Sequence, residues 1–286
     1  MTAAERKAED EEEGYKGAKM EVRLLEKSSD KTKLSFIFNK TTPVYANTLR
    51  RLIINDTTVL AIEDVEMKKN NSALYDETIA HRLGLIPLTT DLKSYRLKSK
   101  CKCDGAGCAQ CELKIKLKAK GPGVIDASSL KSTDPKVEPV YPEMPIVKLT
   151  KGQEIEFVAT AVLGTGKEHA KWIPGLVYFR HKPVIEIGKK AESCELCAKV
   201  CPVKVFDFTN GKLKINQENF LKCTLCNACV DASPDGNSIT VTADKTSVIF
   251  DIESWGQLDC KKMVKTAVES FNETLEEFVE EVNQIK

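Results

Sequence analysis

The cysteines constrain this chain more than any other feature of its sequence. One of its eleven cysteines, Cys260, stands alone, and the others form two clusters. The first cluster consists of Cys101, Cys103, Cys108 and Cys111. The second consists of Cys194, Cys197, Cys201, Cys223, Cys226 and Cys229. Because a long segment without cysteine separates the clusters, we expect two independent sites, each with its own surrounding fold.

Composition indicates what the cysteines are for. The 43 basic and 42 acidic residues leave a net charge of +1, so no overall field draws the chain onto nucleic acid or a membrane. The first residues are acidic where a secretory signal is basic and then apolar, and no apolar run approaches the ~18 residues of a spanning helix. We therefore expect a cytoplasmic protein with no membrane contact. In that reducing compartment, cysteines serve metal or redox chemistry rather than a disulfide framework.

The first cluster reads CKCDGAGCAQC, in which a turn joins a C-x-C pair to a C-x-x-C pair. Two such pairs folded together place four thiolates in a tetrahedron, the arrangement of a structural zinc site. We therefore predict zinc at Cys101, Cys103, Cys108 and Cys111. Four protein ligands leave no open position for water, so no catalysis is expected. The alternative is a cysteine-rich loop without metal.

The second cluster resembles a duplicated bacterial-type ferredoxin motif, C-x2-C-x2-C-x3-C-P, whose fourth cysteine binds the other cluster. In the first half, the second to fourth positions are Cys194, Cys197 and Cys201, while the first is Ala191. In the second half, the first three positions are Cys223, Cys226 and Cys229, while the fourth is Ser233. Proline follows Cys201 and Ser233, as the motif requires.

Because the fourth cysteine of each half binds the cluster of the other half, the cysteines that are present predict how many clusters form. One complete ligand set remains, for a single 4Fe-4S cluster: Cys201, Cys223, Cys226 and Cys229. The second site is degenerate and retains only Cys194 and Cys197. This pair could be free thiols, which we expect first, a redox-responsive disulfide, or part of another ligand set. A zinc ribbon built from the same cysteines is the alternative for the whole segment.

Outside the clusters, the chain shows local signals for several elements. Residues 1–18 lack apolar periodicity and are expected to form a mobile acidic tail. MEVRLLE and KLSFIFN flank a turn and predict a hairpin. Thr42 and Pro43 predict the start of a helix with an apolar stripe from Val44 to Ile53, and DETIAHRLGL predicts a short helix that ends near Gly84.

The last segment has the clearest period in the chain. Its apolar residues recur every three or four positions at Val264, Val268, Phe271, Leu275, Phe278, Val282 and Ile285. This heptad-like seam predicts a long helix that begins near Cys260. The helix could fold onto the chain's own sheet or pair with a helix of another subunit. Phe271, Leu275, Phe278 and Val282 are the expected contacts for such a partner.

Four stretches carry a family resemblance: TTPVYANTLRRLIINDTTVLAIEDVEM, SALYDETIAHRLGLIPL, GTGKEHAKWIP and VIFDIESWG. They resemble the D subunits of archaeal RNA polymerase, relatives of the eukaryotic third-largest subunits and of the bacterial alpha amino-terminal domain. The resemblance spans residues 20–286. Some archaeal D subunits carry a ferredoxin-like insert, and eukaryotic relatives carry a loop similar to residues 101–111.

The resemblance implies an α+β fold with a discontinuous alpha-like dimerisation domain. This domain would comprise residues 19–56 and 238–286. A mainly β domain, residues 57–188, would be inserted in it and would carry the zinc-type loop. A ferredoxin-like domain, residues 189–237, would form the second insert.

The resemblance also implies an assembly role rather than an active site in this chain. Subunit L would pair with the chain to form a platform for the large and small polymerase subunits, and DNA would be met only through the complex. Arg50 and Arg51 match the segment that faces a large subunit, although both could instead pair with nearby acids.

A ferredoxin-type electron-transfer subunit is the competing function. Three features disfavour it: one cluster site has lost two of its four ligands, the module is short, and it lies between two strand regions of another domain.

Overall fold

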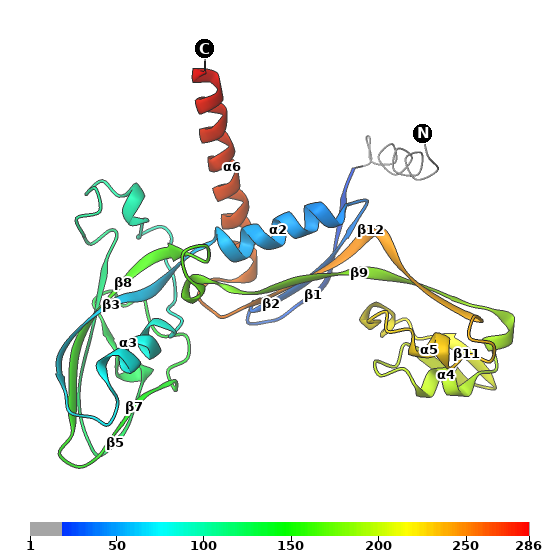
Figure 1. The fold of residues 1–286 in the computed structure, drawn as a ribbon, viewed down its shortest axis with the longest axis horizontal. Helices are drawn as coiled ribbons and strands as arrows, with labels where there is room; N and C mark the ends of the chain where they lie inside the picture. The colour runs from blue at the N-terminus through cyan, green and yellow to red at the C-terminus, as the bar shows by residue number, and fades with distance from the viewer. Residues whose placement is uncertain (1–18, 286) are drawn as a thin grey trace. The chain divides into compact units, whose positions relative to one another are not determined.

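The computed structural model describes residues 19–285 (Figure 1), so the predicted acidic tail lies outside the described residues. The chain divides into two compact units. The described residues of unit 1 are 19–25, 35–47 and 179–250, and those of unit 2 are 26–34, 48–178 and 251–285. Within 19–285, no helix has the length and apolar character needed to cross a bilayer.

The fold mixes short and long helices with antiparallel strands. The strands are β1 (Glu21–Lys27), β2 (Lys33–Asn39), β3 (Thr58–Asn70), β4 (Leu113–Lys120), β5 (Gly123–Asp126), β6 (Lys131–Ser132), β7 (Pro145–Leu149), β8 (Glu154–Thr165), β9 (Gly175–Ile187), β10 (Phe206–Thr209), β11 (Lys212–Ile215) and β12 (Ile239–Ser254). The helices are α2 (Pro43–Asn55), α3 (Asp76–Gly84), α4 (Glu195–Lys199), α5 (Ala228–Asp231) and α6 (Cys260–Gln284). This mixed composition agrees with the expected α+β class.

One four-stranded sheet has the order β1-β2-β12-β9. Strands β1 and β2 form the predicted hairpin, closed by the hydrogen bond from Ser28 N–H to the Lys33 carbonyl at 3.1 Å. Inside the turn, the Asp30 carboxylate accepts from the Thr32 N–H at 3.1 Å. The short polar side chains thus satisfy the turn's backbone groups, which is why this sequence reverses here.

Helix α2 begins as predicted at Pro43, because Thr42 caps it: the Tyr45 N–H donates to Thr42 Oγ1 at 3.2 Å. Its buried face includes Ala46, Leu49 and Ile53. Val44, predicted to belong to the same stripe, is instead 75% exposed. At 3.6 residues per turn, position 44 lies on the side of the helix opposite to these three residues. The stripe prediction is therefore wrong at this one residue.

The main core of unit 2 lies beneath the antiparallel sheet β3-β8-β4-β6. Strand β4 alternates buried Leu113, Ile115 and Leu117 with exposed lysines, as expected for a sheet with one solvated face. Helix α3, predicted to end near Gly84, covers the apolar face with Ile79 and Leu83, both fully buried. This packing makes residues 58–165 a stable base for the loop that precedes β4.

Unit 1 contains a small module built from the β10–β11 hairpin and the helices α4 and α5. Its core is mostly aliphatic and aromatic, and several cysteines pack within it. The buried members are Ile185, Ala191, Cys197, Val205, Phe206, Leu213, Cys229 and Ile239. Since a module this short has few apolar residues to bury, its cysteines contribute a large share of its interior.

Helix α6 starts where the sequence predicts. Asp259 caps it by accepting from the Lys262 N–H at 2.8 Å. Cys260 is 2% exposed and its Sγ donates to the Thr32 carbonyl at 3.1 Å, so this lone thiol packs at the helix start. Met263 and Ala267 are also buried, but beyond Ala267 none of the described helix residues is. Only the first two turns of α6 therefore pack into the core of unit 2, and no residue of the described remainder is buried.

Candidate metal centres and partner surface

The first cysteine cluster folds into a tight loop before β4. All four sulfurs lie within 4.8 Å of one another. The Cys101 and Cys103 sulfurs are 3.4 Å apart, and the Cys101–Cys108 and Cys103–Cys111 distances are both 3.6 Å. Positive φ angles at Asp104, Gly105 and Gly107 fold the chain back. The structure thus brings the four predicted residues together in a group that could hold a metal ion.

The local environment shifts the pKa values of the loop cysteines in both directions, and the thiolate is the form that binds metals. The Cys108 N–H donates to Cys111 Sγ at 3.2 Å, and the Gln110 N–H donates to Cys108 Sγ at 3.4 Å. Hydrogen bonding with the Cys101 thiol lowers the pKa of Cys103 to about 6. Burial, in contrast, raises the pKa of Cys111 to about 12. A cation among the sulfurs would replace the protons that they now share.

Ion pairs that the cysteine motif did not predict join the two ends of this loop. The Glu112 carboxylate lies 2.8 Å from Lys98 Nζ and 3.6 Å from Lys114 Nζ. These contacts lower the pKa of Glu112, with the Lys98 hydrogen bond the largest cause. A Cβ at Gly107 would lie only 2.8 Å from Glu112 Oε1, so the carboxylate occupies space that glycine leaves open. The sequence signal for these ion pairs is that Lys98 precedes the first cysteine of the loop, while Glu112 and Lys114 follow the last one.

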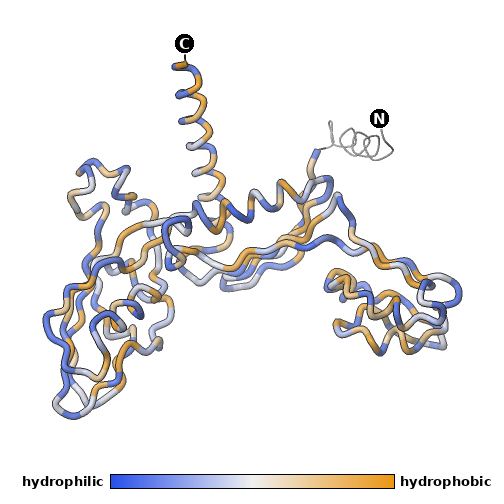
Figure 2. The backbone as a smooth tube through the Cα atoms, in the orientation of Figure 1, coloured by the Kyte–Doolittle hydropathy of each residue, from blue (hydrophilic) through white to orange (hydrophobic). Residues whose placement is uncertain are grey.

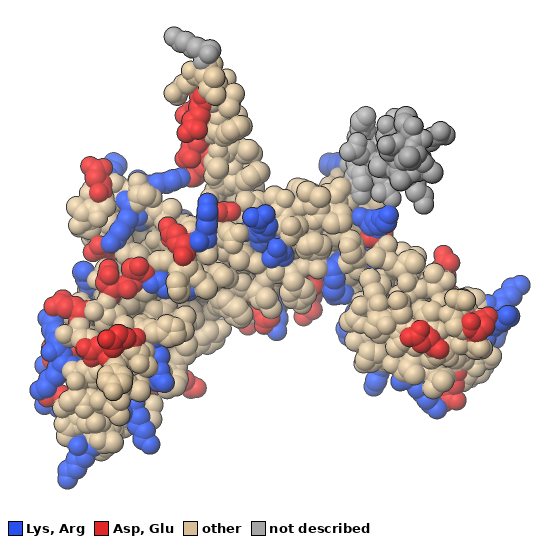
Figure 3. Space-filling model, viewed as in Figure 1, with Lys and Arg blue, Asp and Glu red and all other residues tan. Residues whose placement is uncertain are grey.

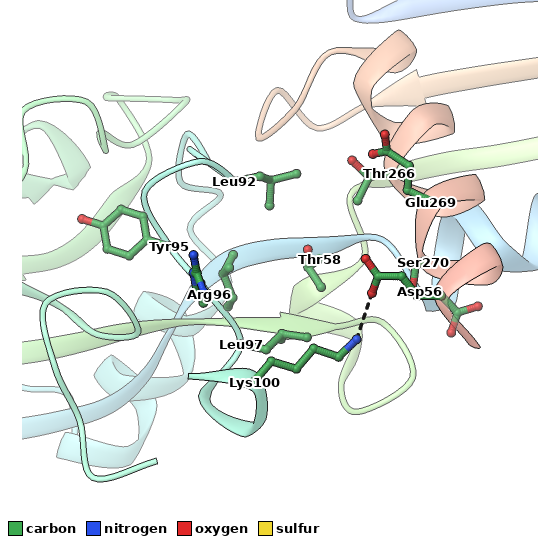
Figure 4. Close-up of a pocket in the computed structure, with 12 residues that line it drawn as sticks. Asp56, Thr58, Leu92, Tyr95, Arg96, Leu97, Lys100, Thr266, Glu269 and Ser270 are labelled. Atoms are coloured by element: carbon green, nitrogen blue, oxygen red, sulfur yellow. Dashed lines mark hydrogen bonds and ion pairs between the residues drawn. The ribbon is translucent and has the colours of Figure 1, made fainter. Parts of the chain in front are cut away.

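Lys100, next to Cys101, extends from the loop to helix α6. Its Nζ lies 2.9 Å from Glu273 Oε2, drawn as a dashed line in Figure 4. The pair borders a hollow of about 370 Å³ within unit 2. Charged residues of both signs line it, including Asp56, Arg96 and Glu269. None of the described residues that line the hollow is a cysteine or histidine.

The second cluster divides into a pair and a set of four. Cys194 and Cys197 form a disulfide with a Cα–Cα distance of 5.5 Å. Each sulfur lies 3.6 Å from the Ala232 carbonyl oxygen. Ala191, in the position where the ferredoxin motif has its first cysteine, is fully buried. Of the three states considered for the pair, the structure therefore has the disulfide.

The other four cysteines, Cys201, Cys223, Cys226 and Cys229, are neighbours in the same module. Burial raises the pKa of Cys229, and the charges of the other three add to the rise. Burial likewise raises the pKa of Cys223, and the positive charge of Arg180 opposes part of this rise. The Val205 N–H also donates to Cys201 Sγ at 3.3 Å. The four cysteines thus belong to one small module, and a backbone amide contacts one of them.

Helix α6 carries the largest uncovered apolar stripe of the described helices. The side chains of Phe271, Leu275, Phe278 and Val282 are 38%, 44%, 61% and 46% exposed. Figure 2 shows apolar and polar residues alternating along the helix, and Figure 3 shows acidic side chains gathered along one side. Scattered single apolar residues are normal on a surface, but a continuous stripe marks an interaction site.

The two arginines predicted to contact a large subunit differ in environment. Arg51 is exposed, whereas Arg50 is half-buried and already has an interaction within the chain. Arg51 is therefore the more accessible of the two for an external partner.

Comparisons with known proteins identify relatives of this chain. The family described as "RNA polymerase Rpb3/RpoA insert domain" matches residues 65–174. DNA-directed RNA polymerase subunit Rpo3 of Methanosarcina acetivorans is 37% identical over 268 residues, covering 93% of this chain and 99% of the relative. The subunits of the same name from Pyrococcus horikoshii and Archaeoglobus fulgidus are 33% and 32% identical, with the same coverage.

Proposed function

Since the chain belongs to the family of archaeal DNA-directed RNA polymerase subunits named Rpo3, we propose that it is a non-catalytic assembly subunit of such a polymerase. The observation that carries this proposal is similarity along 93% of the chain to subunits of one name. The chain would act in transcription as a scaffold, and it would meet DNA only through the assembled complex. The competing role, a ferredoxin-type electron-transfer subunit, is not favoured by this similarity.

The domain organisation that we propose follows the family resemblance. Residues 19–56 and 238–286 would form the dimerisation domain, with residues 1–18 as an acidic tail. Residues 57–188 would form the inserted β domain, which overlaps the matched insert domain at 65–174. Residues 189–237 would form the inserted ferredoxin-like domain, and the small core that they share with Ile185 and Ile239 supports this assignment.

We propose that the exposed face of α6 binds subunit L. Four side chains spaced 4, 3 and 4 residues apart, Phe271, Leu275, Phe278 and Val282, form one continuous stripe along the helix. Burying such a stripe against a second helix gains about 25 cal/mol for each Å² of apolar surface removed from water. The large subunits would then assemble on the heterodimer, with Arg51 and Arg50 as candidate contacts.

Pairing is tested by co-expressing this chain with a candidate subunit L and purifying through a tag on one of them. Phe271→Glu with Phe278→Glu is expected to abolish co-purification, because both substitutions place charge in the apolar stripe. Glu276→Lys and Glu280→Lys, on the acidic side of α6, serve as the control. Equal recovery of the partner with both double variants would reject α6 as the pairing surface.

The four-cysteine loop would hold zinc. In a tetrahedral site with Zn–S bonds of about 2.3 Å, neighbouring sulfurs lie about 3.8 Å apart. Neighbouring sulfurs in this loop lie 3.4–3.8 Å apart and all four lie within 4.8 Å of one another, which fits a single small ion better than a cluster of four irons with its more widely spaced ligands. The metal would be structural, fixing the loop next to Lys100.

The second donor set would hold one 4Fe-4S cluster through Cys201, Cys223, Cys226 and Cys229. All-cysteine ligation is the chemistry that such clusters require. The degenerate second site supports a count of one, because Ala191 has no ligand atom and Ser233 Oγ already donates to the Val230 carbonyl at 2.7 Å. When bound, the cluster would contribute its binding energy to the folding of the inserted module.

Both metal assignments are tested by anaerobic purification followed by iron, sulfide and zinc analysis. We expect about four irons and four sulfides and about one zinc per chain. Nearly eight irons would reject the degenerate second site. Zinc at two equivalents without sulfide would favour the zinc-ribbon alternative for the second cluster.

A further inference from the structure

Arg180 lies far in sequence from the iron–sulfur ligands but contacts the turn that presents one of them. It is half-buried on strand β9, and its Nη1 donates to the carbonyl oxygen of Leu221. Leu221 is the central residue of the helical turn Phe220–Lys222, and Cys223 follows that turn directly. Both partners belong to unit 1.

A second side chain fixes the same turn from its other end. Asn219 Nδ2 donates to the Lys204 carbonyl at 3.1 Å, which ties the turn to the loop after Cys201. The Cys223 N–H closes the turn by donating to the Phe220 carbonyl at 3.2 Å. Arg180 and Asn219 together therefore set the position of the Cys223 ligand relative to Cys201.

The guanidinium of Arg180 also lies near the ligand. Its hydrogen-bond partner, the Leu221 carbonyl, belongs to the residue two positions before Cys223. Arg180 therefore holds its positive charge on the Cys223 side of the ligand set.

We propose that Arg180 is a positioning residue for the iron–sulfur cluster, which anchors the Cys223 turn to strand β9 and places a fixed positive charge beside that ligand. This inference rests on the proposed 4Fe-4S cluster. A cluster with four thiolates is negatively charged, and one-electron reduction adds a further negative charge to it. A nearby cation therefore stabilises the reduced state, and net charge is one of the properties that set the potential of such clusters.

The test is a redox titration of the full chain purified anaerobically, followed by electron paramagnetic resonance. In Arg180→Met, the ratio of reduced to oxidised cluster at a fixed potential is expected to fall about three- to tenfold, where tenfold corresponds to 59 mV for one electron. Arg180→Lys keeps the charge and should stay closer to the wild type. Lys212→Met removes an exposed charge from the same module and should leave the ratio unchanged.

The outcomes separate this inference from the proposed cluster itself. If the wild type carries no iron and sulfide, both the cluster and the inference fail. If it carries them and Arg180→Met titrates as Lys212→Met does, only the role of Arg180 is overturned. Should Arg180→Met fail to bind iron, normal binding by Arg180→Lys and Lys212→Met supports the role of Arg180, and loss of iron from Lys212→Met as well rejects it.

Discussion

Lys100 Nζ lies 2.9 Å from Glu273 Oε2, and this ion pair joins the residue before the first metal-loop cysteine to the terminal helix. Glu277 lies 3.8 Å from the same nitrogen. Both contacts raise the pKa of Lys100, with the Glu273 hydrogen bond the largest cause. The proposed zinc loop and the proposed pairing helix are therefore directly linked within unit 2.

This link is expected to be weak on its own. Lys100 and Glu273 side chains are 56% and 61% exposed, so solvent screens their attraction. In a double-mutant cycle with Lys100→Ala and Glu273→Ala, we expect a coupling of about 0.2–1 kcal/mol in the free energy of unfolding. The coupling should vanish in about 1 M salt, where the screening length is about 3 Å. A coupling that survives high salt would contradict a simple surface ion pair.

Gly107→Ala is expected to weaken metal binding by the loop more than Gly105→Ala. Both glycines have positive φ angles, 90° and 80°, so both substitutions strain the backbone. Only at position 107 would the new Cβ meet the Glu112 carboxylate, and moving that carboxylate breaks its contact with Lys98. Zinc affinity measured by competition with a chelator tests the difference. Equal affinities for the two variants would show that the Glu112 contact is unimportant.

Serine substitutions should distinguish the iron–sulfur ligands from the degenerate pair. Cys226→Ser is expected to remove most of the iron and sulfide, because it deletes one of four ligands. Cys194→Ser with Cys197→Ser should leave the iron content near the wild-type value, since the structure joins these two sulfurs to each other. Iron and sulfide analysis of the two variants, with zinc as an internal reference, is the measurement. Loss of iron from the Cys194 and Cys197 variant would reject the proposed ligand set.

Stability at high pH should depend on Tyr95. Its hydroxyl donates to Asp134 Oδ2 at 2.9 Å, and burial, with this hydrogen bond, raises the pKa of Tyr95 to about 12. Because the folded-state pKa exceeds the unfolded value of about 10, the contribution of Tyr95 is fully present below pH 10 and declines as the pH rises through 12.

Chemical denaturation between pH 9 and pH 12 tests this expectation. Tyr95→Phe should be less stable than the wild type at pH 9, and the gap should narrow towards pH 12. A constant gap across this range would contradict the proposed role of the hydroxyl proton.

Local signals in the sequence predicted several elements correctly. The cap at Thr42, proline at position 43 and glycine at position 84 define helix ends through contacts within a few residues. The turn at Asp30 is local in the same way. Apolar character alone predicts Val44 on the buried face, but the rotation of about 100° between successive helix residues places it on the opposite face.

The contacts that organise the candidate sites were not predictable in this way. Arg180 meets Leu221 across 41 residues, and Lys100 meets Glu273 across 173. No periodicity or motif relates such positions, because their proximity results from how strands and helices pack. The same is true of α6, whose regular apolar period did not reveal that only its first turns are covered in this chain.

The sequence by itself determined the ligand types, their spacing, the loss of one ligand position in each ferredoxin half and the family resemblance. These properties depend on residue identity and on short covalent distances. Only the tertiary structure decided which charges surround each cysteine group and which face of α6 remains exposed. Those outcomes depend on contacts between distant segments, which form only when burial of the apolar core offsets the entropy of ordering the chain.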